Sequence, residues 1–423
     1  MASISSLVAS HRPSLDPYIE LYKHFHRNPE LSYQEHETAA KIIELLKELG
    51  SFEIFPNIST GLAAVCKNGP GKTVLLRADI DALPVQEKTG LEYASTKKMK
   101  NLEGAEKSVM HACGHDMHIT SLLAAAKLLT SCRDAWSGTL ILCFQPAEER
   151  GSGARAMVAA GLYTKYVPVP DVVLGGHVMP FRTGTIGTRR GMMASAADSY
   201  AVTMYGRGAH GSQPHRSVDP VVMAAHTVVR LQTIPSRETD PSDLSVVTVG
   251  AINAGDAENI IPETAELKLD TRSISPVTRE RVLASLTRIV NAEAQASNAP
   301  RPPTITKTRE FPFLHNDDDA TAAIESSFAT HFGDAYDANA PRLGGSEDFG
   351  ELATAVNKPA VFWAYGGIDP ALWDKAEKAG TLTEDIPVNH SPYFAPTVMP
   401  TLQIAVDAFA VAALTWLKND SSI

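Results

Sequence analysis

The sequence has few cysteines and no concentration of positive charge. Its four cysteines, Cys66, Cys113, Cys132 and Cys143, are scattered through 423 residues without a regular spacing. They therefore form no disulfide framework of the kind that stabilises small secreted domains, and we expect a reducing compartment. The 48 acidic residues outnumber the 38 lysines and arginines, which gives a formal net charge of −10. This balance argues against nucleic-acid binding and against attraction to anionic membranes.

Long apolar runs are also missing. No run reaches the roughly 18 residues that a membrane helix needs, and the apolar pattern near the C-terminus is interrupted by Gln403 and Asp407. The first ten residues contain neither the basic stretch nor the apolar centre of a secretory signal. We therefore expect a soluble, cytoplasmic protein that has no membrane partner.

Length and periodicity predict two domains. A chain of 423 residues exceeds one ordinary compact core, and 44% hydrophobic residues can fill two. Buried-strand patterns alternate with helical patterns in residues 1–192 and again in 311–423, which predicts an α/β domain with a mainly parallel or mixed sheet sandwiched by helices. Residues 193–310 follow the order β-α-β-β-α-β, so we expect an inserted ferredoxin-like α+β domain there.

Two local patterns near the predicted sheet carry specific expectations. Ser32 and Glu35 have the spacing of a capping box before a helix that stops at Gly50. A short strand is predicted over 171–176, so that His177 would follow a strand end.

The stretch from Val109 to His118 is unusually rich in side chains that bind metals. It contains three histidines, Cys113 and an aspartate within eight positions, and none of these side chains is a good core filler. Gly114 lets the backbone bend, so Cys113 and His115 can point at one centre. A helical pattern follows, and we expect its N-terminal dipole to favour a thiolate at Cys113. The stretch predicts a metal site.

Further ligand types occur at predicted strand ends and in loops. The candidates are Cys113, His115, Glu149, His177 and His390, with Asp79 or Asp81 nearby. Five candidates are too many for one structural zinc, so two metals that share a bridging water fit better. Such a pair would lower the pKa of the water and polarise the carbonyl that it attacks. Glu148 lies beside Glu149, and we expect it to act as the general base and acid.

Five segments resemble the M20 metallopeptidase family. They are Met110–His118, Gln145–Glu149, Gly206–Gly211, Asn259–Pro262 and Gly345–Phe349. They are most similar to the amidohydrolase branch, which includes hippurate hydrolases, N-acyl-amino-acid deacylases and auxin-conjugate hydrolases. The resemblance implies a zinc-peptidase-like catalytic domain and an inserted lid through which the protein forms a homodimer.

The resemblance also implies roles for individual residues. The two metals would be bound by Cys113, His115, Glu149, His177 and His390. Zinc, manganese, cobalt and nickel all suit this ligand set. Glu148 would be the general acid/base, and Asp81 would orient a metal ligand. In the lid, His210 would reach the partner's active site and stabilise the oxyanion. Asn259 and Arg272 would hold substrate, and Arg272 would pair with a substrate carboxylate.

Two segments differ from the usual pattern of this branch. Arg150 stands where a small residue is common, and Leu269-Asp270-Thr271-Arg272 replaces a Gly-Thr-x-Arg run. Both differences concern substrate choice more than reaction type.

The prediction is a dinuclear metal amidohydrolase that cleaves the amide bond of an N-acyl or aryl-acyl amino acid or a related small conjugate. A metal-dependent dipeptidase or carboxypeptidase of the same fold is one alternative. A non-catalytic binding homologue and a protein with a single structural zinc are others, although the retained Glu148 argues against the former. A thiol hydrolase with Cys113 as nucleophile is also open, but surplus metal ligands surround that cysteine.

Overall fold

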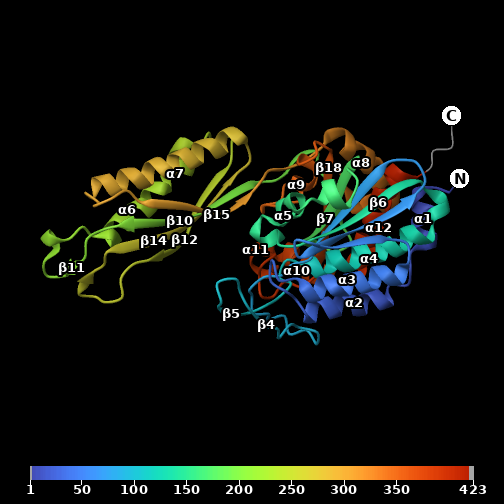
Figure 1. Ribbon diagram of the computed structural model, residues 1–423, viewed down its shortest axis with the longest axis horizontal. Coiled ribbons are helices and arrows are strands. Elements are labelled where there is room, and N and C mark those ends of the chain that lie inside the picture. Colours follow the sequence, from blue (N-terminus) through green and yellow to red (C-terminus); the bar gives the residue numbers. More distant parts are fainter. Residues whose placement is uncertain (1, 419–423) are drawn as a thin grey trace. The chain divides into compact units, whose positions relative to one another are not determined.

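The computed structural model describes residues 2–418 and divides into two compact units (Figure 1). The first unit comprises the chain up to Met193, His315–Arg342 and the chain from Asp348 onward. The second comprises Ala194–Leu314 and Leu343–Glu347. The sequence pattern assigns the short segment Leu343–Glu347 to the first domain, whereas in the structure it groups with the second unit.

The first unit is built on an eight-stranded mixed sheet with the order β1-β2-β6-β3-β7-β18-β8-β17. Its strands are β1 (Glu53–Ile58), β2 (Gly61–Asn68), β3 (Thr73–Asp79), β6 (Gly138–Gln145), β7 (Val172–Arg182), β8 (Ile186–Gly187), β17 (Tyr336–Asp337) and β18 (Ala360–Ile368). The central strands β6, β3, β7 and β18 run parallel, and antiparallel pairs join β1 to β2 and β2 to β6. Parallel strands that are covered on both faces read as continuous apolar runs, as β6 and β18 do.

Helices cover both faces of this sheet (Figure 1). On one face, α4 and α12 lie on the strands, with α1, α2, α3 and α8 packed beside them. The opposite face carries α5, which packs on β6, and α9, which packs on β7. The helices are α1 (Ile4–His11), α2 (Asp16–Arg27), α3 (His36–Leu49), α4 (His115–Ser131), α5 (Gly153–Ala160), α8 (Asp318–Phe332), α9 (Gly350–Thr354), α10 (Pro370–Ala379), α11 (Leu382–Asp385) and α12 (Val398–Leu417). This is the mixed α/β architecture predicted from the sequence.

The helix α12 is long and apolar enough to cross a membrane when only its length and composition are considered. The prediction that the sequence contains no such helix is therefore wrong. In the structure α12 packs against α4, α8 and the strands of the sheet, and 67% of its most apolar window is buried. Asp407 in its middle forms an ion pair with Arg12 at 2.6 Å. These contacts are those of a core helix.

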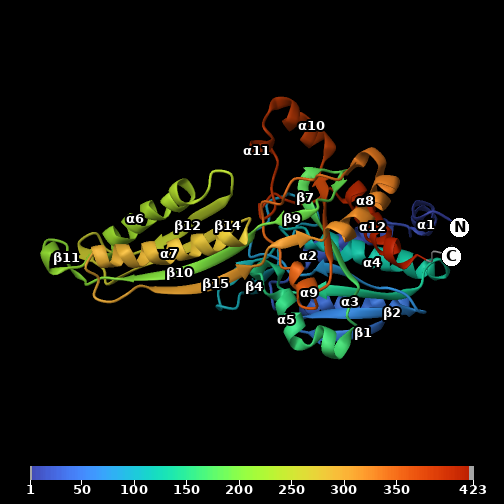
Figure 2. The same ribbon diagram turned by 90° about the horizontal axis from the view of Figure 1, so that it is seen from above.

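The second unit is a four-stranded antiparallel sheet with two helices on one face (Figure 2). Its sheet has the order β12-β14-β10-β15, with strands β10 (Ala196–Tyr205), β12 (Ser245–Asn253), β14 (Thr264–Ser273) and β15 (Thr304–Phe311) and helices α6 (Pro220–Leu231) and α7 (Pro276–Ala296). Alternate residues of β14, beginning with Ala265, are buried under the helices. The order along the chain is β-α-β-β-α-β, as the ferredoxin-like prediction requires. Three two-stranded ribbons complete the described chain: β4 (Lys98–Lys100) with β5 (Glu106–Ser108), β9 (Gly191–Ala194) with β16 (Leu314–Asn316), and β11 (Ala209–His210) with β13 (Ile260–Ile261).

The capping box predicted at Ser32 and Glu35 does not form. The hydroxyl of Ser32 donates to Asp81 at 2.7 Å, and Glu35 accepts the backbone N–H of Ala147 at 2.8 Å. The N–H groups of the first turn of α3 are accepted by the carboxylate of Glu30 instead. The two predicted capping side chains bond to other parts of the domain because a neighbouring carboxylate already satisfies the helix terminus.

Candidate metal and catalytic site

The five predicted metal ligands converge in the first unit at the carboxyl ends of the central strands. They are Cys113 in the turn before α4, His115 at its first residue, Glu149 in a short 3-10 turn after β6, His177 in β7 and His390 in the loop before α12. The ligand atoms of Cys113, His115 and Glu149 all lie within 4.8 Å of one another. The prediction that His177 follows a strand end is wrong, because β7 continues to Arg182.

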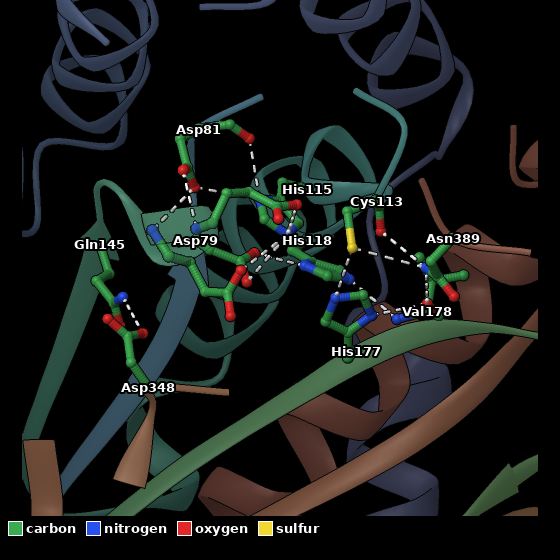
Figure 3. Close-up of polar contacts among 12 residues, drawn as sticks. Asp79, Asp81, Cys113, His115, His118, Gln145, His177, Val178, Asp348 and Asn389 are labelled. Atoms are coloured by element: carbon green, nitrogen blue, oxygen red, sulfur yellow. Dashed lines mark hydrogen bonds and ion pairs between the residues drawn. The ribbon is translucent and has the colours of Figure 1, made fainter. Parts of the chain in front are cut away.

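Three short distances relate the ligand atoms to one another. The two carboxylate oxygens of Glu149 face different histidines: Oε1 lies 3.8 Å from His115 Nε2, and Oε2 lies 3.3 Å from His390 Nε2. The sulfur of Cys113 lies 3.5 Å from His177 Nε2 (Figure 3). The Glu149 carboxylate thus lies between two imidazoles that come from different parts of the chain.

Hydrogen bonds orient two of the imidazoles toward this centre. The Nδ1 atom of His115 bonds to the backbone carbonyl of Asp81 at 2.9 Å, and Nδ1 of His177 bonds to that of Val178 at 2.7 Å. In each ring this contact leaves Nε2 directed at the other ligands. Among the described residues, the buried Nε2 of His115 has no hydrogen-bond partner. A divalent cation would satisfy this atom, and the set of thiolate, imidazole and carboxylate donors fits such a cation.

The electrostatics of the centre also favour a cation. Burial would lower the pKa of His115, but the charges of Asp79, Asp81 and Glu149 raise that pKa to about 10. Burial and the charges of Glu149 and Glu148 raise the pKa of the Cys113 thiol well above its usual value. Both groups therefore carry protons at neutral pH until a cation replaces those protons. The expectation that the helix dipole favours a thiolate at Cys113 is wrong for the metal-free protein, because burial and the carboxylates outweigh the dipole.

Asp81 orients both sides of the centre. Besides the carbonyl bond to His115, its buried carboxylate accepts the backbone N–H groups of Glu148 at 3.2 Å and of Glu149 at 3.1 Å. The hydroxyl of Ser32 is a third donor to this carboxylate. One aspartate thus connects an imidazole ligand to the turn that carries the two glutamates.

Glu148 has the position that an acid/base beside the ligands requires. It is buried, and its Oε2 lies 4.0 Å from His115 Nε2. The preceding residue, Ala147, has a left-handed backbone with φ of 51°, which is unusual for a residue with a Cβ. Glu35 accepts the N–H of Ala147 and supports this turn.

A buried polar network beneath the ligands was not predicted. His118 donates from Nδ1 to Asp79 at 2.5 Å and accepts the N–H of Val178 at Nε2 at 2.9 Å, so both ring nitrogens are engaged within the protein. Asp79 also binds Arg77 at 2.7 Å, and the pKa of Asp79 lies well below its usual value: burial raises it, but Arg77 and the histidines lower it more. Gln145 accepts from Arg77 and donates to Asp348 at 2.6 Å (Figure 3). Arg77, a charged residue inside an otherwise apolar strand, was the signal that a buried ion pair lies at this place.

The remaining predicted site residues lie in the second unit. His210 pairs with Ile260 across the β11–β13 ribbon, and the backbone carbonyl of Asn259 accepts the N–H of Gly211 at 2.8 Å. These two predicted residues are therefore neighbours, and both are exposed.

Arg272 lies near the far end of β14 from this ribbon. Its guanidinium donates to Asp270 at 2.9 Å and to Ser346 at 2.9 Å. Part of its hydrogen-bonding capacity is thus already used within the second unit.

Residues 75–387 match the model of peptidase family M20/M25/M40. The chain belongs to this family. It is 41% identical over 329 residues to the hippurate hydrolase of Campylobacter jejuni, covering 77% of this chain and 82% of that protein. It is 38% identical over 280 residues to the N-acyl-L-amino acid amidohydrolase of Geobacillus stearothermophilus, covering 66% and 72%. A Bacillus subtilis protein of the M20 family, described as a dinuclear metal binding peptidase, superposes with a TM-score of 0.72 at 28% identity, covering 96% of this chain and 98% of that one.

These similarities confirm the family that the sequence motifs indicate. Membership of this peptidase family also confirms the predicted class of enzyme, a hydrolase of amide bonds. The matched segment contains every predicted site residue except His390, which follows it by three positions.

Proposed function

We propose that the protein hydrolyses the amide bond of N-acyl or aryl-acyl amino acids with two divalent cations. The cations would be held by Cys113, His115, Glu149, His177 and His390. The observation that carries the proposal is the convergence of these five donors, in which each oxygen of Glu149 faces a different histidine. A structural zinc needs four donors and no vacant position, so this surplus favours a catalytic pair. The similarity to a dinuclear metal binding peptidase supports the number of cations.

The cations would polarise the scissile carbonyl and lower the pKa of the attacking water. Glu148 would accept a proton from that water and transfer it to the leaving nitrogen. Its burial and its fixed backbone support this role, because Asp81 holds the N–H of Glu148 in place. Zinc, manganese, cobalt and nickel remain the candidate metals, since all four bind mixed thiolate, imidazole and carboxylate sets.

The substrate class follows from the relatives rather than from the pocket. Hippurate hydrolase and N-acyl-L-amino acid amidohydrolase are both named for acylated amino acids. We propose Asn259 and Arg272 as groups that hold the substrate. Asp270 neutralises part of the positive charge of Arg272 and weakens its attraction for a substrate carboxylate.

We also propose a homodimer through the second unit, in which His210 would stabilise the oxyanion in the partner's site. The strand β12 supports this assembly: it lies at the edge of its sheet, and its apolar side chains Val246 and Ile252 are 41% and 49% exposed. Unpaired edge strands with exposed apolar residues favour pairing with another chain.

We propose a cytoplasmic location. The four cysteines, all within residues 2–418, form no disulfide in the structure.

The test is the release of free amino acid from a panel of N-acetyl, N-benzoyl and indole-acyl amino acids, with dipeptides and longer peptides as additional arms. Chelated protein is compared with protein reloaded separately with zinc, manganese, cobalt and nickel. We expect activity to disappear on chelation and to return with metal, and the ranking of the panel to identify the acyl group. Release only from peptides would favour the peptidase alternative, and no release by metal-loaded protein would contradict the proposal.

A further inference from the structure

The loop that carries His390 is held differently from the other ligand segments. His390 has a left-handed backbone with φ of 71°, which is unfavourable for a residue with a Cβ. Its side chain is 54% exposed, whereas the other four proposed ligands are buried. Neither burial nor a relaxed backbone therefore fixes this imidazole; its own contact is with Glu149 at 3.3 Å, and contacts of the neighbouring residues hold the loop.

Two of these contacts use only the main chain. The N–H of His390 donates to the carbonyl of Ala112 at 2.7 Å, and the N–H of Lys88 donates to the carbonyl of Pro392 at 2.8 Å. They attach the loop to the turn before α4 and to the loop after β3. A side-chain substitution in the His390 loop leaves both bonds available.

The third contact is the side chain of Asn389. Its Nδ2 lies 3.3 Å from the carbonyl oxygen of Cys113, 3.3 Å from that of Val178 and 3.8 Å from Cys113 Sγ. Figure 3 shows this amide directed between Cys113 and Val178. The same carbonyl of Val178 accepts the Nδ1 proton of His177 and so fixes that ring. The amide of Asn389 therefore contacts Cys113 directly and is linked to His177 through the shared carbonyl of Val178. The third proposed ligand, His390, is the next residue in the chain.

We propose that Asn389 is a positioning residue that locks the His390 loop onto Cys113 and His177 and donates an N–H to the cysteine sulfur in the metal-loaded protein. The inference rests on the proposed dinuclear site. An N–H donor reduces the negative charge on a thiolate and so tunes its bond to a metal, as groups outside the ligand set commonly do. The amide has two protons for three acceptors, so the weaker contact with sulfur competes with the two carbonyls.

The experiment compares Asn389→Ala and Asn389→Leu with the wild-type chain. Leucine keeps the branched arrangement and the number of heavy atoms of the asparagine side chain, fills at least the same space, and removes its donors. The matched control is Asn291→Ala on α7, because Asn291 is exposed and donates only to Thr287 of its own helix. Thermal melting of the metal-free proteins establishes that each variant folds. Metal affinity is measured by competition with a chelator, and the thiolate-to-cobalt charge-transfer absorption is recorded on cobalt-loaded protein.

We expect both Asn389 variants to bind the more weakly held cation about 10- to 100-fold less tightly than wild type. Their thiolate-to-cobalt band should shift, because a sulfur without an N–H donor gives more charge to the metal. The Asn291 control should match wild type in both measurements. A purely structural role would change the melting temperature without moving the band.

Two results would overturn the inference. Wild-type affinity and an unshifted band in Asn389→Leu would show that the donors of Asn389 do not act on the site, and an effect in Asn389→Ala alone would assign it to lost volume. If the alanine variant does not fold, the leucine variant decides. Neither measurement uses a substrate, so failure of the amidohydrolase proposal in the panel assay would be seen separately.

Discussion

Asp81→Asn is the substitution whose consequences the structure defines most closely. The buried carboxylate of Asp81 accepts three donors: the N–H of Glu148 at Oδ1, and the N–H of Glu149 and the hydroxyl of Ser32 at Oδ2. An asparagine amide must place its NH₂ group at one of these two positions. In either orientation it faces a backbone N–H, and two donors then oppose each other in a buried environment.

The expected cost follows from this geometry. One buried backbone N–H loses its acceptor, which costs about 1–3 kcal/mol. The carbonyl bond from Asp81 to His115 remains, because it belongs to the main chain. The damage should therefore fall on the turn that carries Glu148 and Glu149 and on His115, whose Nδ1 also lies 3.3 Å from the Asp81 carboxylate and would lose that negative charge. Metal affinity should decrease by about 10- to 100-fold, as is usual when a group that orients a ligand is lost.

Chemical denaturation of the metal-free protein measures the first effect, and competition with a chelator measures the second. The denaturation midpoint should decrease at an unchanged slope. The matched control is Asp240→Asn in the second unit, because Asp240 accepts a backbone N–H from Ser242 but is exposed. We expect this control to remain within about 0.5 kcal/mol of wild type. An Asp81→Asn protein as stable as the control and with wild-type metal affinity would refute the reasoning.

Three further predictions concern proton transfer and charge. Glu148→Gln should lose about 10²- to 10⁴-fold in kcat while it binds the same number of cations, because an amide cannot accept the proton. Metal binding near pH 7 should release protons from His115 and Cys113, which isothermal titration calorimetry in buffers of different ionisation enthalpy detects. The carboxylates around His26, chiefly Asp116, raise the pKa of His26 to about 9 although burial opposes them. Its ion pairs should therefore stabilise the fold fully below about pH 6.5, by about 3 kcal/mol, and this contribution should be lost as the pH rises through 9.

Each of these predictions has its own control. The control for Glu148→Gln is Glu106→Gln on the exposed β4–β5 hairpin, which should leave turnover unchanged. Undiminished turnover in Glu148→Gln would contradict the role of Glu148 as general base. For proton release from His115 and Cys113, a heat of metal binding that is the same in every buffer would contradict the raised pKa values. For His26, the difference in unfolding free energy between wild type and His26→Gln should shrink from pH 6.5 to pH 9.5. A difference that does not depend on pH would mean that His26 acts without its charge.

Residue type and apolar periodicity predicted much of this structure. The strands β3 and β6 are continuous buried runs, and the ligand-rich stretch that leads into α4 has no packing explanation. The strand β1 was not predicted, because it includes Pro56 and its exposed residues do not alternate. The capping box at Ser32 failed because local spacing does not reveal which distant group satisfies a helix terminus.

The residues that support the site were the hardest to predict. Arg77 and Asp348 are separated by 271 positions, and Asn389 and Cys113 by 276. A polar side chain becomes a support only through partners of this kind, and a single sequence does not identify them. The ligands themselves are recognisable because their chemistry is unusual wherever they occur.

The order in which the chain is synthesised bears on when the centre can form. Cys113 and His115 belong to the first part of the outer unit, whereas His390 and α12 are synthesised after the inserted unit and after β18. The inserted unit has its own apolar core, whose residues all lie within Ala194–Leu314 and precede them in the chain. It can fold during translation while the outer sheet still lacks β18 and its covering helix. The full ligand set therefore cannot assemble, and metal cannot be held by all five donors, until the loop that carries His390 has been synthesised.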